Sequence, residues 1–145
     1  MFKHVLLPTD GSKLSDKSVK QGIRLAKSLQ AKITALHVIP RYHTFTYQSD
    51  MLEATREDYT RASEKRAEEF LRHVKRVAAG AGVECETMHA TSDQPFKEII
   101  RTAEKKDCDL ILMASHGRKG IEGLLLGSET QKVLTHSKTP VLVYR

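Results

Sequence analysis

The sequence predicts an open α/β fold, in which a parallel β-sheet is covered by helices on both faces. Short apolar stretches typical of buried strands alternate along the chain with stretches whose apolar residues recur at helical spacing. Strands that alternate with helices in this way form parallel sheets, with the helices packed on the two faces. The 145 residues contain no internal repeat and are expected to form one domain, residues 1–145.

The first half of the chain predicts two strands and two helices. Residues 4–9 are the first strand, which the triplet Asp-Gly-Ser at 10–12 breaks. A helix over 15–29 and a strand over 32–39 follow, and Pro40 ends the strand. Residues 41–57 have no clear period, so no element is predicted there, and the run Tyr-His-Thr-Phe-Thr-Tyr at 42–47 is loop-like. A long amphipathic helix over 59–79 has one stripe of residues at helical spacing and is stopped by Gly80 and Gly82; the stripe is Ala62, Arg66, Phe70, Val74 and Val77.

The second half predicts three further strands. Residues 83–90 alternate, as expected of a strand near a sheet edge, and a helix then opens at 92–95 and runs to about Lys105. Residues 110–114 and 141–144 are the last two strands, with a short helix over 128–136 between them. Ligands of parallel sheets bind beyond the carboxyl ends of the strands, where the strand order reverses. The residues at those ends are Pro8, Thr9, Asp10, Val38, Ile39, Pro40, Met113, Ala114 and Ser115.

Composition and charge favour a reduced, water-soluble protein with an anionic ligand. The net charge is +6, but the basic residues of 56–76 are interleaved with acidic ones, which is typical of a solvated helix face. Nucleic-acid binding is therefore not expected. The apolar runs are far shorter than the roughly 20 residues that a membrane helix needs, and the start shows no secretory signal. Cys85 and Cys108 lack a C-x-x-C spacing, so we expect free thiols in the cytoplasm.

Metal ligands and a catalytic group are not evident in the sequence. The histidines do not show the spacing of metal ligands, so no structural metal is expected. Asp10, His116 and Glu129 are candidates for positioning a hydrolytic water, but none of them has an evident orienting partner. No catalytic residue is assigned on this basis.

Four of the eight glycines lie between Gly117 and Gly127, in the connection from the fourth strand to the short helix. The P-loop and dinucleotide patterns are both absent. Glycine nevertheless lets a backbone approach a ligand closely. The first amides of the following helix, those of Ser128, Glu129 and Thr130, lack internal partners and form a potential anion site, to which Arg118 and Lys119 would add positive charge.

Two alternatives need no anion. The spacing Ser128-x-x-Gln131 matches a capping box, and Gly117 and Gly120 would serve as ordinary turn residues. Asp10 is similarly open to two interpretations. A carboxylate at the end of the first strand would bind a sugar hydroxyl or Mg²⁺, or it would cap the turn before the first helix.

Five segments carry a resemblance to a known family: HVLLPTDGS at 4–12, LHVIP at 36–40, SHGR at 115–118, LLLGS at 124–128 and TPVLVY at 139–144. Together they make the whole chain similar to the universal stress protein family. The nucleotide-binding branch of this family carries the pattern G-x2-G-x9-G-[ST]. Gly117, Gly127 and Ser128 match its later part, whereas Ala114 stands in place of its first glycine, where a methyl group would crowd the ribose.

The resemblance implies a five-stranded parallel sheet of order 3-2-1-4-5 and bound ATP (or ADP or AMP) with Mg²⁺. Thr9 and Asp10 would lie by the sugar, and the Val38 backbone would meet the adenine. Gly117 and the residues from Gly127 to Thr130 would hold the phosphates. The candidate binding residues are Pro8, Thr9, Asp10, Val38, Met113, Ala114, Gly117, Arg118, Gly127, Ser128, Glu129 and Thr130.

The expected function is ATP binding in stress response or signalling, with little or slow turnover. One alternative is a slow ATPase or an autophosphorylating enzyme, and another is a dimeric interaction module with a vestigial nucleotide site. In the implied strand order Val141, Leu142, Val143 and Tyr144 form an apolar edge strand, which favours a homodimer through antiparallel pairing of two such strands. Alternatively, the chain end folds back, or the 59–79 helix covers the edge.

Overall fold

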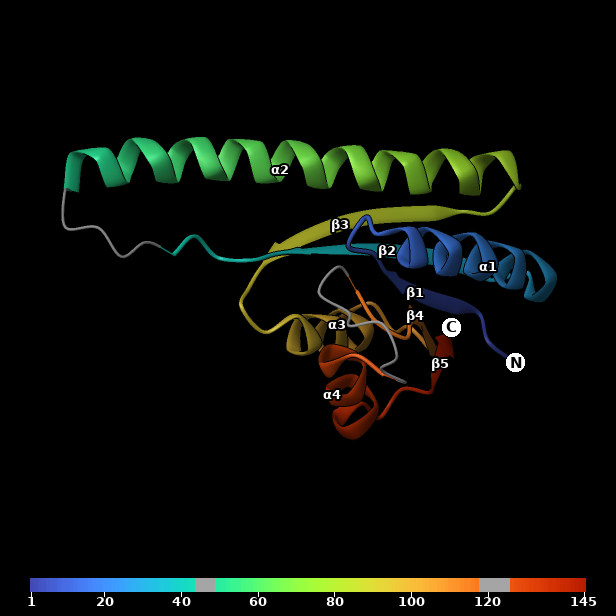
Figure 1. The fold of residues 1–145 in the computed structure, drawn as a ribbon. Helices are drawn as coiled ribbons and strands as arrows, with labels where there is room; N and C mark the ends of the chain where they lie inside the picture. Colours follow the sequence, from blue (N-terminus) through green and yellow to red (C-terminus); the bar gives the residue numbers. More distant parts are fainter. Residues whose placement is uncertain (44–48, 118–125) are drawn as a thin grey trace.

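The computed structural model describes residues 1–43, 49–117 and 126–145. Within these residues five parallel strands form one sheet of order β3-β2-β1-β4-β5, which confirms the predicted fold class and strand order (Figure 1). The elements in chain order are β1 (His4–Pro8), α1 (Lys13–Leu29), β2 (Lys32–Ile39), α2 (Ser49–Gly80), β3 (Cys85–Thr91), α3 (Pro95–Lys105), β4 (Leu110–Ala114), α4 (Ser128–His136) and β5 (Val141–Tyr144).

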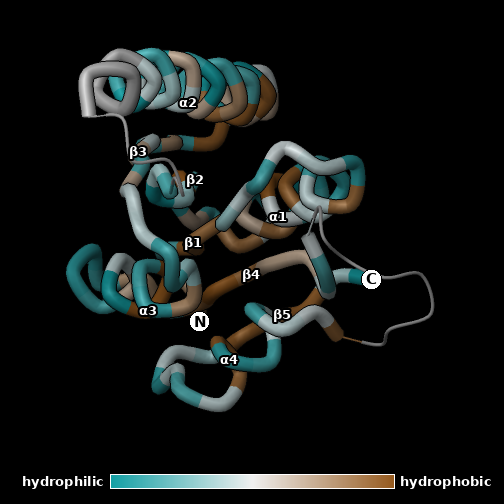
Figure 2. Tube along the Cα trace, turned by 60° about the vertical axis from the view of Figure 1, so that its left-hand side comes forward, coloured by the Kyte–Doolittle hydropathy of each residue, from teal (hydrophilic) through white to brown (hydrophobic). Residues whose placement is uncertain are grey.

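The sheet separates two hydrophobic clusters, because successive side chains of a strand point to opposite faces. Val5 and Leu7 of β1 lie in the cluster under α1 and α2, whereas Leu6 lies in the cluster with α3 and α4. Figure 2 shows the same division, with the apolar strands running between the two helical layers. Full burial of each such side chain stabilises the fold by about 1.5–3 kcal/mol. None of the helices in the described part of the chain has an apolar run suited to crossing a membrane.

Helix α2 begins at Ser49, so the predicted start at Tyr59 is wrong by ten residues; of the loop-like run 42–47, residues 44–47 lie outside the described part. No proline or glycine interrupts 49–79, and helix formers such as Met, Leu, Glu, Ala and Arg are frequent there. The helix therefore continues past the point where its apolar period fades. The predicted stripe is also partly wrong, because Ala62 and Arg66 are exposed. Among residues 55–80 of this helix, the buried side chains are Ala67, Leu71, Val74 and Ala78.

The strand order reverses between β1, the central strand, and its neighbour β4. The ladder from β1 to β2 continues to the pair Pro8↔Leu36. The ladder from β1 to β4 joins only Val5↔Leu110 and Leu6↔Ile111, although both strands are fully described. The carboxyl ends of β1 and β4 thus part from each other. Such a switch point is where ligands of open α/β sheets bind.

Candidate functional site

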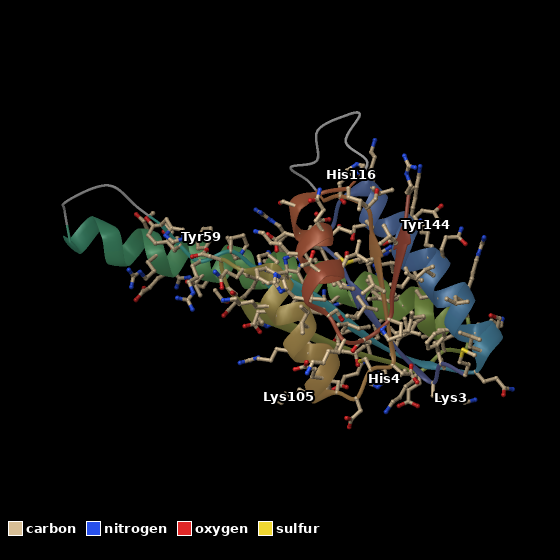
Figure 3. The ribbon with its side chains drawn as sticks, turned by 90° about the horizontal axis from the view of Figure 1, so that it is seen from below. Lys3, His4, Tyr59, Lys105, His116 and Tyr144 are labelled. Carbon is tan, nitrogen blue, oxygen red and sulfur yellow. The ribbon has the colours of Figure 1, made fainter. Side chains whose placement is uncertain are left out.

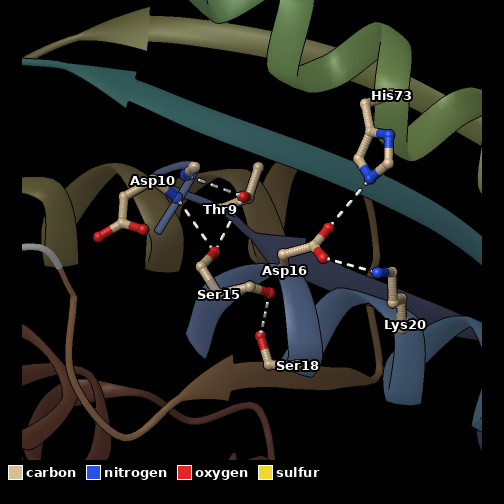
Figure 4. Close-up of polar contacts among 8 residues, drawn as sticks. Thr9, Asp10, Ser15, Asp16, Ser18, Lys20 and His73 are labelled. Carbon is tan, nitrogen blue, oxygen red and sulfur yellow. Dashed lines mark hydrogen bonds and ion pairs between the residues drawn. The ribbon is translucent and has the colours of Figure 1, made fainter. Parts of the chain in front are cut away.

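The turn after β1 is held by a network of hydroxyl groups (Figure 4). The Ser15 hydroxyl donates to Thr9 Oγ1 over 2.9 Å and accepts from the Asp10 amide over 3.2 Å. Thr9 Oγ1 also accepts from the Gly11 amide at 3.3 Å. Ser12, rather than Asp10, caps α1, because its hydroxyl accepts from the Ser15 amide at 3.1 Å. The backbone that carries Thr9 and Asp10 is therefore fixed before any ligand arrives.

The Asp10 carboxylate contacts both its own turn and the segment after β4. Its Oδ1 accepts from the Ser12 amide at 2.9 Å, which forms a local Asx turn and agrees with the turn interpretation of this residue. A Cβ placed on Gly117 would overlap Asp10 Oδ2. The fold thus brings Asp10, after β1, against Gly117, after β4, and only glycine leaves room for the carboxylate at this approach.

Two residues that were not predicted support this turn from behind. His37 in β2 is buried, and its Nδ1 lies 2.7 Å from the Thr9 carbonyl oxygen. Because a carbonyl only accepts, this nitrogen carries the proton. The Phe70 ring of α2 packs edge-on against His37, with centroids 5.5 Å apart, and also covers Gly11, whose φ of +77° suits glycine. A histidine inside a buried strand beside Val38 was the only sequence signal for this contact.

Helix α4 begins against the residues that follow β4, since Gly127 packs on Ser115 and His116. Gly127 is its N-cap, and the first intrahelical bond is from the Gln131 amide to the Gly127 carbonyl, 3.0 Å. The amides of Ser128, Glu129 and Thr130 precede that bond, so α4 itself supplies no acceptor for them.

The capping-box alternative is wrong, because Ser128 is already inside the helix. The side chain of Gln131 donates instead to the Leu126 carbonyl at 3.1 Å. Glycine is needed at the N-cap position by packing: a Cβ on Gly127 would lie 3.1 Å from the Cα of His116. The Gly127 amide also donates to the Ser115 carbonyl at 2.6 Å.

The side chains of the first turn of α4 differ in their directions. Thr130 is buried, and its hydroxyl donates to the Ala114 carbonyl at 3.0 Å, which ties α4 to the end of β4. Because its hydroxyl is already bonded, Thr130 would bind an anion through its backbone amide. Ser128 is exposed. The Glu129 carboxylate turns to α3, where it accepts from the Phe96 amide at 2.9 Å.

The remaining predicted residues line the switch point mainly through their backbone. Met113 and Ala114 are buried at the end of β4, and the Met113 side chain belongs to the cluster under α3 and α4. Val38 is half-buried against the same cluster, and Pro8 is the last paired residue of β1. Arg118 lies outside the described residues, as do Lys119, Gly120 and Gly123.

A second polar cluster joins α1 to α2 away from the switch point (Figure 4). Asp16 lies 2.8 Å from Lys20 Nζ and 3.0 Å from His73 Nε2. The hydrogen bond from Lys20, followed by that from His73, holds the pKa of the Asp16 carboxyl below its usual value against the opposing effect of burial. All three side chains are more than one-third exposed, so this cluster is worth at most about 1 kcal/mol.

A buried polar pair, His4 and Thr34, lies near the amino ends of β1 and β2. Lys3 and His4 lie at the end of the molecule opposite His116 (Figure 3). His4 Nε2 lies 2.8 Å from Thr34 Oγ1, and both residues are buried. Burial, followed by the charge of Lys32, lowers the pKa of His4. Among residues 1–43, 49–117 and 126–145, no three His, Cys, Asp or Glu side chains gather to hold a metal ion.

Comparison with known proteins places the chain among relatives of one kind. The model of the universal stress protein family matches residues 1–145. A universal stress protein of Methanocaldococcus jannaschii is 32% identical over 145 residues, covering 100% of this chain and 83% of that protein. The structure of universal stress protein UspA from Lactobacillus plantarum has a TM-score of 0.88 at 23% identity, over 99% of this chain and 98% of that one. A universal stress protein solved in complex with cAMP has a TM-score of 0.73 at 25% identity, over 99% of this chain and 97% of that one.

Proposed function

Because the chain belongs to the universal stress protein family, we propose that it binds an adenine nucleotide across the separated carboxyl ends of β1 and β4. The nucleotide is ATP, or ADP or AMP, and ATP is bound with Mg²⁺. The relative solved with cAMP supports this ligand class, since its fold matches over nearly the whole chain.

One observation carries the proposal: Asp10 meets Gly117 at the switch point, and Gly127, which opens α4, packs against His116, the neighbour of Gly117. Amides at a helix start suit phosphate oxygens, and a carboxylate at a short distance from them suits a ribose hydroxyl or Mg²⁺. In this proposal the phosphates bind the amides of Ser128, Glu129 and Thr130. The sugar binds beside Thr9 and Asp10. The adenine then lies over the Val38 backbone, and Arg118 adds charge to the phosphate end.

Ala114 is compatible with this proposal, although the family pattern has glycine there. Its residue is buried, and its carbonyl is taken by the Thr130 hydroxyl, 3.0 Å away. Because side chains alternate along β4 and Met113 lies in the cluster under α3 and α4, the Ala114 methyl group points to the face of the sheet that carries α1. The proposal therefore requires the ribose to lie beyond the end of β4, clear of this methyl group.

In the cell the protein would act in the cytoplasm, as a single domain that senses or carries the nucleotide in stress response or signalling. Turnover is little or slow, since the sequence offers no oriented base for attack on the γ-phosphate. The candidate His116 has its Nδ1 3.2 Å from Ser115 Oγ, a contact that holds the loop.

The nucleotide that co-purifies with the protein, identified by mass spectrometry, tests the proposal. Calorimetric titration of the stripped protein with Mg·ATP, AMP and adenosine then gives the affinities. Saturable binding of an adenine nucleotide is expected. A folded protein that carries none and titrates with none supports the interaction module instead, and linear phosphate release that persists through further purification supports the slow ATPase.

We also propose that the protein is a homodimer through β5. This strand pairs with β4 on one side, and Leu142 is 45% exposed. The carbonyls of Pro140 and Tyr144 accept from the amides of Ile111 and Ser115, so in a parallel ladder residues 141 and 143 point their amides to the open edge. A two-fold axis lets two such edges pair.

Substitution Val143→Pro tests the dimer with little damage to the subunit, because it removes an amide on the open edge and keeps the ladder to β4. The wild type is expected to sediment as a dimer at micromolar concentration, and the variant as a monomer with an unchanged circular-dichroism spectrum. A wild-type monomer, with and without ATP, rules the interface out.

A further inference from the structure

The Glu129 side chain connects the first turns of two helices. Its Oε2 accepts from the Phe96 amide of α3 at 2.9 Å, and its Oε1 lies 3.3 Å from Lys132 Nζ of α4. The side chain is 35% exposed, so the contacts are partly shielded from water. Lys132 Nζ in turn lies 5.4 Å from the centroid of the Phe96 ring. Glu129 thus belongs to a small cluster that spans α3 and α4.

Helix α3 depends on this contact for its N-terminal capping. Its N-cap residue, Gln94, makes no side-chain capping bond, and Pro95 has no amide hydrogen to satisfy. Phe96 is then the first residue of α3 with an amide that needs an acceptor. The acceptor is the Glu129 carboxylate of α4, which takes the role that an N-cap side chain of α3 usually has.

The same contact directs a negative charge away from the proposed phosphates. A carboxylate in the first turn of α4 would compete with an anion for the positive end of that helix. Here the carboxylate lies against the start of α3 and against Lys132, which offset its charge. The Ser128–Thr130 amides are therefore left for another anion.

We propose that Glu129 is a positioning residue for phosphate: it braces the start of α4 against α3, so that the amides of Ser128, Glu129 and Thr130 keep one direction. The proposal rests on the nucleotide binding proposed above. Its consequence is selective, because the brace affects the phosphate end of the ligand and leaves the nucleoside end unchanged. Loss of the brace should reduce affinity for ATP more than affinity for adenosine.

Calorimetric titrations of three variants with Mg·ATP, AMP and adenosine test this assignment. Glu129→Ala removes the acceptor, and we expect about a three- to tenfold loss of ATP affinity, as for a lost helix cap, with adenosine affinity within about twofold of wild type. Glu129→Gln keeps an acceptor for the Phe96 amide and should recover the affinity that alanine loses. Glu104→Ala is the matched control, since it removes the same exposed carboxylate from α3 about 12 Å along the helix from Phe96.

Four titration results would contradict the proposal, each for a different reason. Unchanged ATP affinity in Glu129→Ala overturns the assignment, as does an equal loss for ATP and adenosine, which marks a purely structural role. Equal ATP affinities of Glu129→Gln and Glu129→Ala also overturn it. The negative charge of Glu129, for example as a Mg²⁺ ligand, would then determine the affinity, and not its capping of α3. A wild type that binds none of the three ligands instead refutes the proposed nucleotide site, and this inference with it.

Discussion

Substitution of Gly117 by alanine separates the proposed binding role of Asp10 from the stability of the fold. The new Cβ would overlap Asp10 Oδ2, which is the far end of a flexible side chain. The carboxylate rather than the backbone should therefore move. Because Asp10 is the proposed partner of the ribose or of Mg²⁺, the displacement should weaken nucleotide binding.

The two effects differ in size. Displacement of the carboxylate threatens one hydrogen bond, from the Ser12 amide to Asp10 Oδ1, worth about 0.5–1.5 kcal/mol. Alanine also reduces the conformational entropy of the unfolded chain, which stabilises the fold by about 0.4–1 kcal/mol. The net change in unfolding free energy is therefore within about 1 kcal/mol. Loss of a contact to a charged group costs about 1.5–3 kcal/mol of binding free energy. Mg·ATP affinity should thus fall at least about tenfold.

Calorimetric titration with Mg·ATP gives the affinity, and urea denaturation gives the stability. Gly80→Ala is the matched control, since an added Cβ meets nothing within 4 Å there. Its affinity should equal that of the wild type, and its stability should be equal or slightly higher. Wild-type affinity in a folded Gly117→Ala variant would falsify the proposed pairing of Asp10 with the nucleotide.

Two further predictions concern groups away from the site. Burial lowers the pKa of His4 below its usual 6.5, so the unfolded chain takes up the proton more readily. Its contribution to stability is complete above pH 6.5 and is lost as the pH falls through the lower folded-state pKa. Urea denaturation at pH 7.5 and 5.5 should show a larger drop for the wild type than for His4→Gln, and parallel drops would contradict this. Burial also raises the pKa of Cys85 and of Cys108 to about 11, so iodoacetamide at pH 7 should label them slowly in the native protein and faster in urea; rapid native labelling of either thiol would contradict it.

The fold was largely predictable, because each strand and helix has its own local period. The apolar runs of β1 and β4 and the amphipathic pattern of α1 are such local features. The strand order came from the family resemblance and not from the periodicity. The start of α2 at Ser49 was missed because nothing in the sequence marks where a helix without an apolar face begins.

The candidate site was predictable where it depends on strand ends. Asp10 was assigned to the site because the carboxyl ends of parallel strands share an edge of the sheet, and Gly117 because of the glycine pattern and the family resemblance; the structure brings the two residues together. The contacts of His37 and Phe70 and the direction of the Glu129 side chain were not predicted. They arise between elements distant in sequence, so neither period nor motif contains them.

Amide NMR spectra recorded during titration with Mg·ATP test the nucleotide site most directly. The account predicts the largest shift changes at the amides of Asp10, Ser128, Glu129 and Thr130, with saturation at one equivalent per chain. The amide chemical shifts of His4 and Cys85, at the amino ends of the strands, should not change. Saturation with unmoved amides at the start of α4, or with changes confined to another face of the sheet, would contradict it.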